Sequence, residues 1–175
     1  MKKILRKNFF NRPAPEVARD LLGKYLVREI GGKQTAYMIV ETEAYDSTDD
    51  LASHASKSRT ERNEVMFGEP GIFYAYLVYG MHTMLNVVTG KKDHPGAVLI
   101  RGLQNISGPG TLTKALGIGR EVNKLPAFPK SGLWFEDGGE IVAQKNIKKT
   151  PRIGVAYAGP VWSKKLWRFV IIRTS

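Results

Sequence analysis

Apolar residues recur along the chain with two different periods, which separate predicted helices from predicted strands. A helix is predicted between Pro15 and Gly23, with one apolar face made by Val17, Ala18, Leu21 and Leu22. A shorter helix is predicted after Gly108-Pro109-Gly110, with one apolar face made by Leu112, Ala115 and Leu116. Helical patterns of this kind are few.

Strand patterns are more numerous. Alternating or β-branched apolar runs predict strands at 25–27 and 36–45 around a turn at Gly31-Gly32, at 72–79 and 84–88 on either side of Gly80, and at 97–100. Residues 132–175 indicate further short strands. Because these strands do not alternate regularly with helices, the pattern predicts an α+β fold, a mostly antiparallel sheet with a few flanking helices.

Two segments lack the pattern of a core element. Residues 46–64 are polar and poor in apolar side chains, so they are predicted to form a surface excursion. Residues 119–131 are predicted to be a loop.

The strand from Tyr37 to Tyr45 carries the first candidate chemistry. Alternation predicts a core face of Met38, Val40, Thr42 and Ala44, and an opposite face of Tyr37, Ile39, Glu41, Glu43 and Tyr45. Carboxylates on so apolar a strand need partners or a wet cleft. The pattern alone leaves two interpretations open: an exposed face with two solvated acids, or a general base beside an aromatic wall.

Three tyrosines crowd the strand at 72–79. Tyr74 and Tyr76 share one face, and for Tyr74 the pattern favours packing against the sheet. Tyr79 is predicted to point to the opposite face, where Gly80 ends the strand. An aromatic residue at a hairpin tip gains nothing from the core. In a basic protein it is a candidate for stacking on bases or wedging between them.

Composition narrows the class of protein. The 175 residues, 42% of them hydrophobic, suffice for one domain with a real core. The absence of cysteine excludes disulfides, Cys-ligated zinc, iron–sulfur clusters and thiol catalysis. The histidines, His54, His82 and His94, are not spaced as a helical metal pair, so we expect no metal site. No apolar run approaches the roughly 18 residues of a membrane span, and we expect an intracellular protein without a targeting segment.

The charge is positive and unevenly spread. The formal net charge is +11; residues 1–87 hold 12 basic and 11 acidic side chains, whereas residues 88–175 hold 15 basic and 5 acidic. Such an excess indicates an anionic partner, nucleic acid first and a membrane surface second, with a solvated surface as the plain alternative. No basic amphipathic helix of useful length is visible, which disfavours the membrane.

Taken in order, these motifs resemble the alkyladenine (3-methyladenine) DNA glycosylase family. The most specific stretch is Ile39-Val40-Glu41-Thr42-Glu43-Ala44-Tyr45. The series continues with His54, Arg62-Asn63, Met66-Phe67, Pro70-Gly71, Tyr79-Gly80-Met81, Asn86, Val98-Leu99-Ile100-Arg101, Ser107-Gly108-Pro109, and Arg152-Ile153-Gly154-Val155 with Ala158-Gly159. It departs from the family pattern in being one residue shorter between His54 and the tyrosine strand, and residues 119–150 do not align with it.

The resemblance implies one glycosylase domain over residues 1–175, built on a curved antiparallel sheet with a β-hairpin that inserts into DNA. It implies a monofunctional enzyme that flips damaged purines out of duplex DNA and hydrolyses the N-glycosidic bond, which starts base excision repair. The lesion class is 3-methyladenine, 7-methylguanine, hypoxanthine and ethenoadenine. We expect no cofactor, no AP-lyase activity, no membrane partner, and a DNA-associated monomer.

The same resemblance assigns roles to individual residues. Glu43 matches the general base, Arg101 the arginine that helps it to hold the attacking water, and Tyr79 the residue that replaces the extruded base. The base pocket is matched by Tyr45, Ala52, His54, Tyr76 and Asn86. Of these, Ala52 and His54 match backbone contacts to the base, and Asn86 matches the residue that discourages normal guanine. The alternative that stays open is a non-catalytic nucleic-acid-binding module, in which the paired glutamates have no role.

Overall fold

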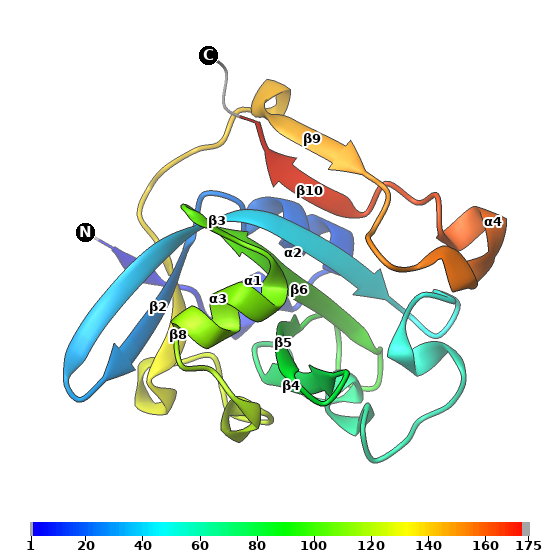
Figure 1. Ribbon diagram of the computed structural model, residues 1–175, viewed down its shortest axis with the longest axis horizontal. Coiled ribbons are helices and arrows are strands. Elements are labelled where there is room, and N and C mark those ends of the chain that lie inside the picture. Colours follow the sequence, from blue (N-terminus) through cyan, green and yellow to red (C-terminus); the bar gives the residue numbers. More distant parts are fainter. Residues whose placement is uncertain (1, 173–175) are drawn as a thin grey trace.

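A long, twisted hairpin supplies the central strands of the sheet. The computed structural model describes residues 2–172, and in it β2 (Tyr25–Ile30) and β3 (Lys33–Asp46) pair around the turn at Gly31 and Gly32 (Figure 1). The 14 residues of β3 pair with β2 through the first half of the strand and with β6 (Gly96–Leu103) through the second. The second half carries the two glutamates singled out above.

The other strands extend this hairpin on both sides. The main sheet has the order β1-β8-β2-β3-β6-β5-β4, and its pairings are antiparallel. The further strands of that order are β1 (Lys3–Ile4), β4 (Phe73–Val78), β5 (His82–Val88) and β8 (Leu133–Asp137). Beside the main order lie β7 (Ile106–Ser107), β9 (Ile147–Thr150) and β10 (Arg168–Ile171), and β10 pairs with β3. The predicted antiparallel sheet is confirmed.

Short helices flank the sheet. The two predicted helices are present as α2 (Ala14–Asp20) and α3 (Pro109–Ala115), and each has a proline in its first turn. Two helices that were not predicted, α1 (Lys7–Phe10) and α4 (Gly159–Trp162), are one turn long. Single 3₁₀ turns cover His54–Ser56, Glu64–Phe67, Arg120–Val122, Pro129–Ser131, Gln144–Asn146 and Ala156–Ala158. Along residues 2–172 no helix is long and apolar enough to cross a membrane.

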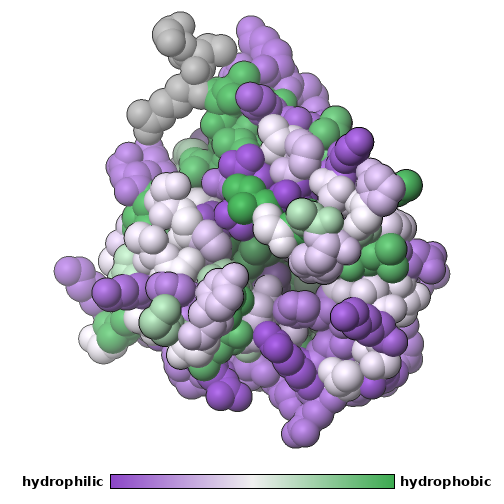
Figure 2. Space-filling model, turned by 45° about the vertical axis from the view of Figure 1, so that its right-hand side comes forward, coloured by the Kyte–Doolittle hydropathy of each residue, from purple (hydrophilic) through white to green (hydrophobic). Residues whose placement is uncertain are grey.

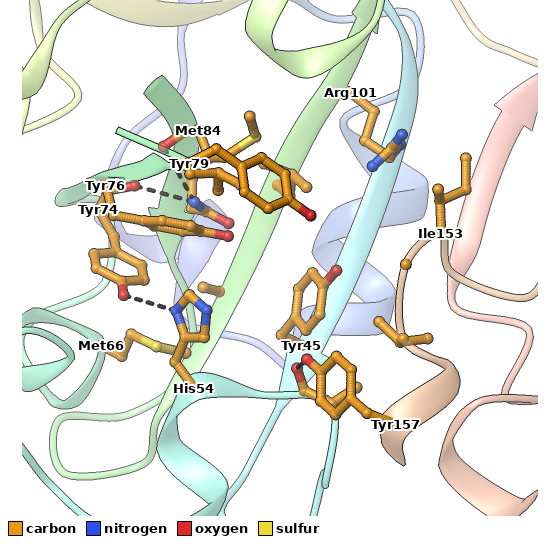
Figure 3. A pocket seen from close by; sticks show the side chains of 17 residues that line it. Tyr45, His54, Met66, Tyr74, Tyr76, Tyr79, Met84, Arg101, Ile153 and Tyr157 are labelled. Carbon is orange, nitrogen blue, oxygen red and sulfur yellow. Dashed lines mark hydrogen bonds between the residues drawn. The ribbon is translucent and has the colours of Figure 1, made fainter. Parts of the chain in front are cut away.

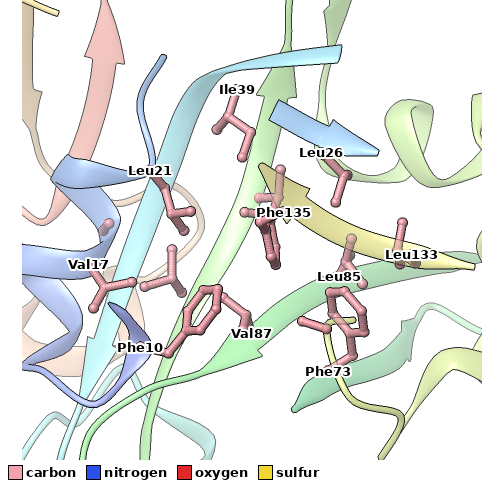
Figure 4. Packing of buried hydrophobic residues seen from close by; sticks show 14 of the residues in the cluster. Phe10, Val17, Leu21, Leu26, Ile39, Phe73, Leu85, Val87, Leu133 and Phe135 are labelled. Atoms are coloured by element: carbon pink, nitrogen blue, oxygen red, sulfur yellow. The ribbon is translucent and has the colours of Figure 1, made fainter. Parts of the chain in front are cut away.

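One apolar core lies between the sheet and the N-terminal helices. Phe10 of α1 and Val17 of α2 meet Phe73, Leu85 and Phe135 from three strands (Figure 4). The ring centroids of Phe10 and Phe135 are 5.5 Å apart. Burying aromatic side chains of this size supplies much of the hydrophobic stabilisation of a domain. The α+β fold class is confirmed, and the core leaves the other face of β3 available for polar groups.

A bulge changes which side chains of β3 share a face. The register between β3 and β6 shifts between Ile39 and Glu41, and again between Glu41 and Thr42. Ile39 and Thr42 are both fully buried although they are three residues apart, and Thr42 donates its hydroxyl hydrogen to the Ala18 carbonyl of α2 at 2.7 Å. The prediction of one continuous odd-numbered face is therefore wrong at Ile39. Against β10 the register is continuous from Glu41 to Glu43, so the two glutamates share a face.

Residues 46–64 form the predicted surface excursion, with most of them exposed, but buried polar residues anchor it. Asp50, Ser53 and Asn63 are buried. The Asn63 side-chain amide donates to the carbonyl oxygens of His54 and Ser58, each at 2.8 Å. Buried hydrogen bonds thus anchor this segment in place of apolar contacts. The loop predicted at 119–131 is confirmed, with only 3₁₀ turns in it.

Candidate active site

A cavity of about 230 Å³ opens beside the second half of β3. Its walls come from β3 to β6, the loop after β3 and the segment 153–157 (Figure 3). The predicted site residues that line it are Tyr45, Ala52, His54, Tyr76, Tyr79, Asn86 and Arg101. On the face drawn in Figure 2 the surface is hollowed near its middle, with hydrophilic and hydrophobic side chains around the hollow. Residues far apart in the sequence therefore meet at one cavity.

Glu43 lies behind the wall of this cavity rather than in its lining. Its side chain is 0% exposed. The Tyr45 hydroxyl donates to Oε2 and the Ile153 backbone N–H donates to Oε1, each at 2.8 Å. Burial raises the pKa of Glu43 above its ordinary value, although Arg101 and the two hydrogen bonds act in the opposite direction. A buried carboxylate with a raised pKa beside a cavity is a candidate proton acceptor.

Arg101 connects Glu43 to a second carboxylate, Glu41. Arg101 Nε donates to Glu41 Oε1 at 3.0 Å, whereas the nearest contacts of the guanidinium to Glu43 are 3.5 Å. Arg168 Nε donates to the same Glu41 oxygen at 2.7 Å. Two carboxylates and two guanidinium groups thus form one network with balanced charge. The interpretation of the two acids as solvated surface groups is wrong.

An aromatic wall faces Tyr45 across the cavity (Figure 3). The ring centroids of His54 and Tyr76 are 4.6 Å apart, and those of Tyr74 and Tyr76 are 5.0 Å apart. His54 Nδ1 lies 2.9 Å from the Tyr74 hydroxyl. Burial, helped by the nearby charge of Arg62, lowers the pKa of His54, and burial raises the pKa of Tyr74 to about 12. The wall is therefore uncharged at neutral pH.

Tyr79 stands at the tip of the β4–β5 hairpin. Tyr79 and Gly80 have positive φ angles of 52° and 69°, and the Met81 N–H donates to the Val78 carbonyl at 3.1 Å. Left-handed φ at both central positions is the pattern of a type I′ turn. This turn brings Tyr79 to the cavity that Tyr76 also lines, so the prediction that it points to the opposite face is wrong. Tyr79 is 88% exposed, which agrees with the prediction that its side chain does not pack in the core.

The segment 153–157 closes one side of the cavity. The Tyr157 hydroxyl donates to the Ala52 carbonyl at 3.0 Å, which holds the loop that carries Ala52 and His54. Asn86 is held in a similar way, because its side-chain amide donates to the Tyr74 carbonyl at 3.1 Å. The sequence did not single out Tyr157, although the motif 152–155 comes directly before it.

A buried ion pair joins this segment to the loop after β3. Arg152 Nη1 and Nη2 lie 2.6 and 2.8 Å from the Asp50 carboxylate oxygens, and both side chains are 0% exposed. The Arg152 guanidinium also lies 4.8 Å from the centroid of the Tyr45 ring. The pair spans 102 residues of sequence. No local pattern signals it.

Histidine and acidic side chains do not converge on a metal centre in the part of the chain that the structure describes. Across residues 2–172, no group of three or more His, Asp or Glu could hold a metal ion. His94 instead lies 3.0 Å from Asp46 Oδ1, away from the aromatic wall.

Comparison with known proteins gives this site a family. The family described as methylpurine-DNA glycosylase matches residues 8–108 and 104–175, which together span nearly the whole chain. The chain belongs to the methylpurine-DNA glycosylase family. Membership confirms the resemblance drawn from the ordered motifs and supports a role as a DNA glycosylase in DNA repair.

Three relatives align with this glycosylase over most of their own length. A protein of Methanocella arvoryzae is 45% identical across 95% of this chain and 91% of its own. The proteins of Myxococcus xanthus and Legionella pneumophila strain Paris are 43% and 42% identical, across 94% and 98% of this chain and 88% and 95% of their own. Each carries the name "Putative 3-methyladenine DNA glycosylase".

Proposed function

We propose that this glycosylase removes alkylated and deaminated purines from duplex DNA by hydrolysing the N-glycosidic bond, with Glu43 as general base. One observation carries the proposal: a cavity with aromatic walls that has a buried, hydrogen-bonded carboxylate behind one wall. A base stacked in a duplex cannot reach such a cavity, so the target nucleotide must rotate out of the helix at a cost of a few kcal/mol.

The walls suit a damaged purine. The rings of Tyr45 and Tyr76 present electron-rich faces, and a purine alkylated at N3 or N7 carries a positive charge. Stacking of this kind is worth about 0.5–2 kcal/mol. That discriminates only modestly, and the weakened glycosidic bond of the lesion supplies much of the remaining selectivity. Asn86, held by the Tyr74 carbonyl, is the residue we expect to discourage normal guanine.

The reaction displaces the purine by water. The water oxygen bonds to C1′ as the bond from C1′ to the purine nitrogen breaks, and the electron pair of that bond leaves with the purine. Glu43 takes the proton of the water, and its charge stabilises the oxocarbenium-like sugar. Arg101, which lines the cavity and lies 3.5 Å from Glu43, is the group we expect to help to hold that water.

The hairpin tip and the residues that line the cavity support two further parts of the proposal, the role of Tyr79 and the absence of AP-lyase activity. Tyr79 is exposed at the rim of the cavity, where its ring can fill the space that the rotated base leaves in the duplex. The residues that line the cavity, all within the described part of the chain, include no lysine. A Schiff base therefore has no lysine amine to form on in this cavity, so we expect no AP-lyase activity. We also expect that the enzyme uses no cofactor and acts as a monomer.

The decisive experiment compares the wild type with Glu43→Gln on duplex DNA that carries 3-methyladenine or hypoxanthine. Excision is measured as abasic sites under single-turnover conditions, and lesion binding is measured separately. We expect the variant to bind the lesion duplex while its excision rate falls by about 10²–10⁴-fold, the usual range for a lost general base. The matched control is Glu29→Gln, at the far end of the β2–β3 hairpin, where Glu29 accepts from Gln34 at 2.7 Å.

The two possible failures are distinct. A wild type that binds lesion DNA and excises neither base would favour the non-catalytic binding module. A Glu43→Gln variant with full activity would leave the reaction standing and remove Glu43 as its base. Because burial raises the pKa of Glu43, excision should fall on acidification at a higher pH than an ordinary glutamate would give.

A further inference from the structure

Glu41 lies two residues before Glu43 on the same face of β3, and the proposed reaction does not use it. Its Oε1 accepts from Arg101 Nε at 3.0 Å and from Arg168 Nε at 2.7 Å. Its side chain is only 13% exposed. A carboxylate that is shared between two arginines and largely removed from water has a defined position.

Arg168 is itself held in place. Its strand β10 pairs with β3 on one side, where Arg168 is opposite Glu43, and with β9 on the other, where it is opposite Thr150. Arg168 Nη1 lies 3.1 Å from Thr150 Oγ1. Two neighbouring strands and one side-chain contact therefore fix the guanidinium that holds Glu41.

The bulge in β3 brings Glu41 to this position, and Gly102 makes room for it. A Cβ atom on Gly102 would lie 3.1 Å from Glu41 Cβ, 3.4 Å from Glu41 Oε2 and 3.6 Å from Val40 Cγ2. Glu41 and Val40 therefore both project over the same glycine. The register shift and the missing side chain together set Glu41 beside Arg101.

The distances show how Arg101 is divided between the two acids. It makes a hydrogen bond to Glu41 at 3.0 Å, but its contacts to Glu43 are 3.5 Å long. Without the charge of Glu41, the guanidinium would be free to form the two-bonded contact that arginine prefers with a carboxylate. That contact would occupy the Glu43 oxygens that must accept the proton of the water.

We propose that Glu41, shared between Arg101 and Arg168, is a positioning residue that keeps the Arg101 guanidinium from closing onto Glu43. This inference rests on the proposed role of Glu43 as general base. The charged, titratable and hydrogen-bonding groups around Glu43 are Arg101 on β6, Arg168 on β10, Glu41 and Tyr45 on β3, Tyr76 on β4 and the Ile153 N–H. Among them Glu41 is the negative charge that opposes Arg101, and it acts to raise the pKa of Glu43.

The test uses two variants with opposite expected effects. In Glu41→Gln, Arg101 closes onto Glu43, so Glu43 should titrate at lower pH by about half a unit or more, about a threefold change in proton affinity. In Arg168→Gln, one positive charge is lost and Glu41 holds Arg101 more firmly, so Glu43 should titrate at higher pH. Glu29→Gln, at the far hairpin, should change neither.

Two measurements record the titration of Glu43. One is the ¹³C NMR shift of the glutamate side-chain carboxyl carbons in free protein, with Glu43 assigned by its loss in Glu43→Gln. The other is the acid limb of the single-turnover excision rate, in which Glu41→Gln should also be several-fold slower on the plateau while lesion binding is unchanged. The NMR measurement needs no activity, so it tests the inference even where the proposed function fails.

The inference is supported if Glu43 titrates at lower pH in Glu41→Gln and at higher pH in Arg168→Gln. The inference is overturned if both variants lose activity while the titration of Glu43 stays unchanged, or if both shift that titration in the same direction. A merely structural role of Glu41 would not shift the titration in opposite directions in the two variants. Should Glu41→Gln fail to fold, Arg168→Gln decides alone. The Arg168 side chain is 23% exposed, so its loss leaves less buried charge behind.

Discussion

Replacing Arg152 with methionine should destabilise the protein more than replacing any surface arginine. Arg152 and Asp50 are both fully buried and are joined by two bonds of 2.6 and 2.8 Å. Arg152 also donates to the carbonyl oxygens of Ala44 at 2.9 Å and Trp162 at 3.2 Å. Its removal leaves the Asp50 carboxylate buried without a compensating charge, and both carbonyls lose a donor.

The expected loss of stability follows from the buried, unpaired charge of Asp50. Removing one partner of a buried ion pair costs about 3–5 kcal/mol, because the remaining charge keeps its desolvation penalty. In a domain of this size each kcal/mol lowers Tm by about 2–4 °C, so Arg152→Met should melt about 6–20 °C below the wild type. The assay is urea unfolding followed by far-UV circular dichroism, with thermal melts alongside.

A double-mutant cycle separates the charge from the packing. Asp50→Leu combined with Arg152→Met removes both charges, so the double variant should be more stable than Arg152→Met alone. The matched control is Arg59→Met. Arg59 lies 2.6 Å from Glu64, but both side chains are about half exposed, 47% and 49%, and water screens the pair, so its loss should cost far less. Additive losses in the cycle, or an Arg152→Met cost below about 1 kcal/mol, would refute the reasoning.

Three further outcomes are expected. Tyr79→Ser should weaken binding to a lesion duplex, measured by fluorescence anisotropy, without lowering Tm; a large fall in Tm would mean a core role. Changing Lys164 and Lys165 to Ala should make the salt dependence of DNA binding shallower by up to about 1.8 in log–log slope if both meet phosphates, whereas Lys33→Ala should leave it unchanged. Because burial raises the pKa of Glu43, its charged form destabilises the fold, so Glu43→Gln should raise the free energy of unfolding at neutral pH. That gain should shrink as the pH falls toward about 4.3, because the folded wild type takes up the proton at a higher pH than an unfolded glutamate does.

Local patterns predicted most of the fold. The Gly31-Gly32 turn, the tyrosine strand and the helices α2 and α3 depend on neighbours within a few residues, so the sequence was sufficient to find them. Helix α1 was missed because a single turn has too few apolar positions to show a period. The buried anchors of the segment 46–64 were missed for another reason. Polar composition predicts exposure only when the polar groups lack partners, and Asn63 has them.

The sequence likewise predicted only part of the candidate site. The ordered motifs named the residues that surround the cavity, but they did not predict that Tyr79 turns back to it, because the direction of a hairpin tip depends on two φ angles. Nor did they predict that Glu43 is fully buried.

By itself, then, the sequence determined the elements, the family and the identities of the side chains around the cavity. The tertiary structure alone decided their chemistry. Glu41 meets Arg101 and Arg168 from 60 and 127 residues away, and Arg152 meets Asp50 from 102. Burial and charge depend on such distant groups, and these set the basicity of Glu43. Periodicity along the chain reports only on near neighbours, so it could place the carboxylate on the strand but could not determine its surroundings.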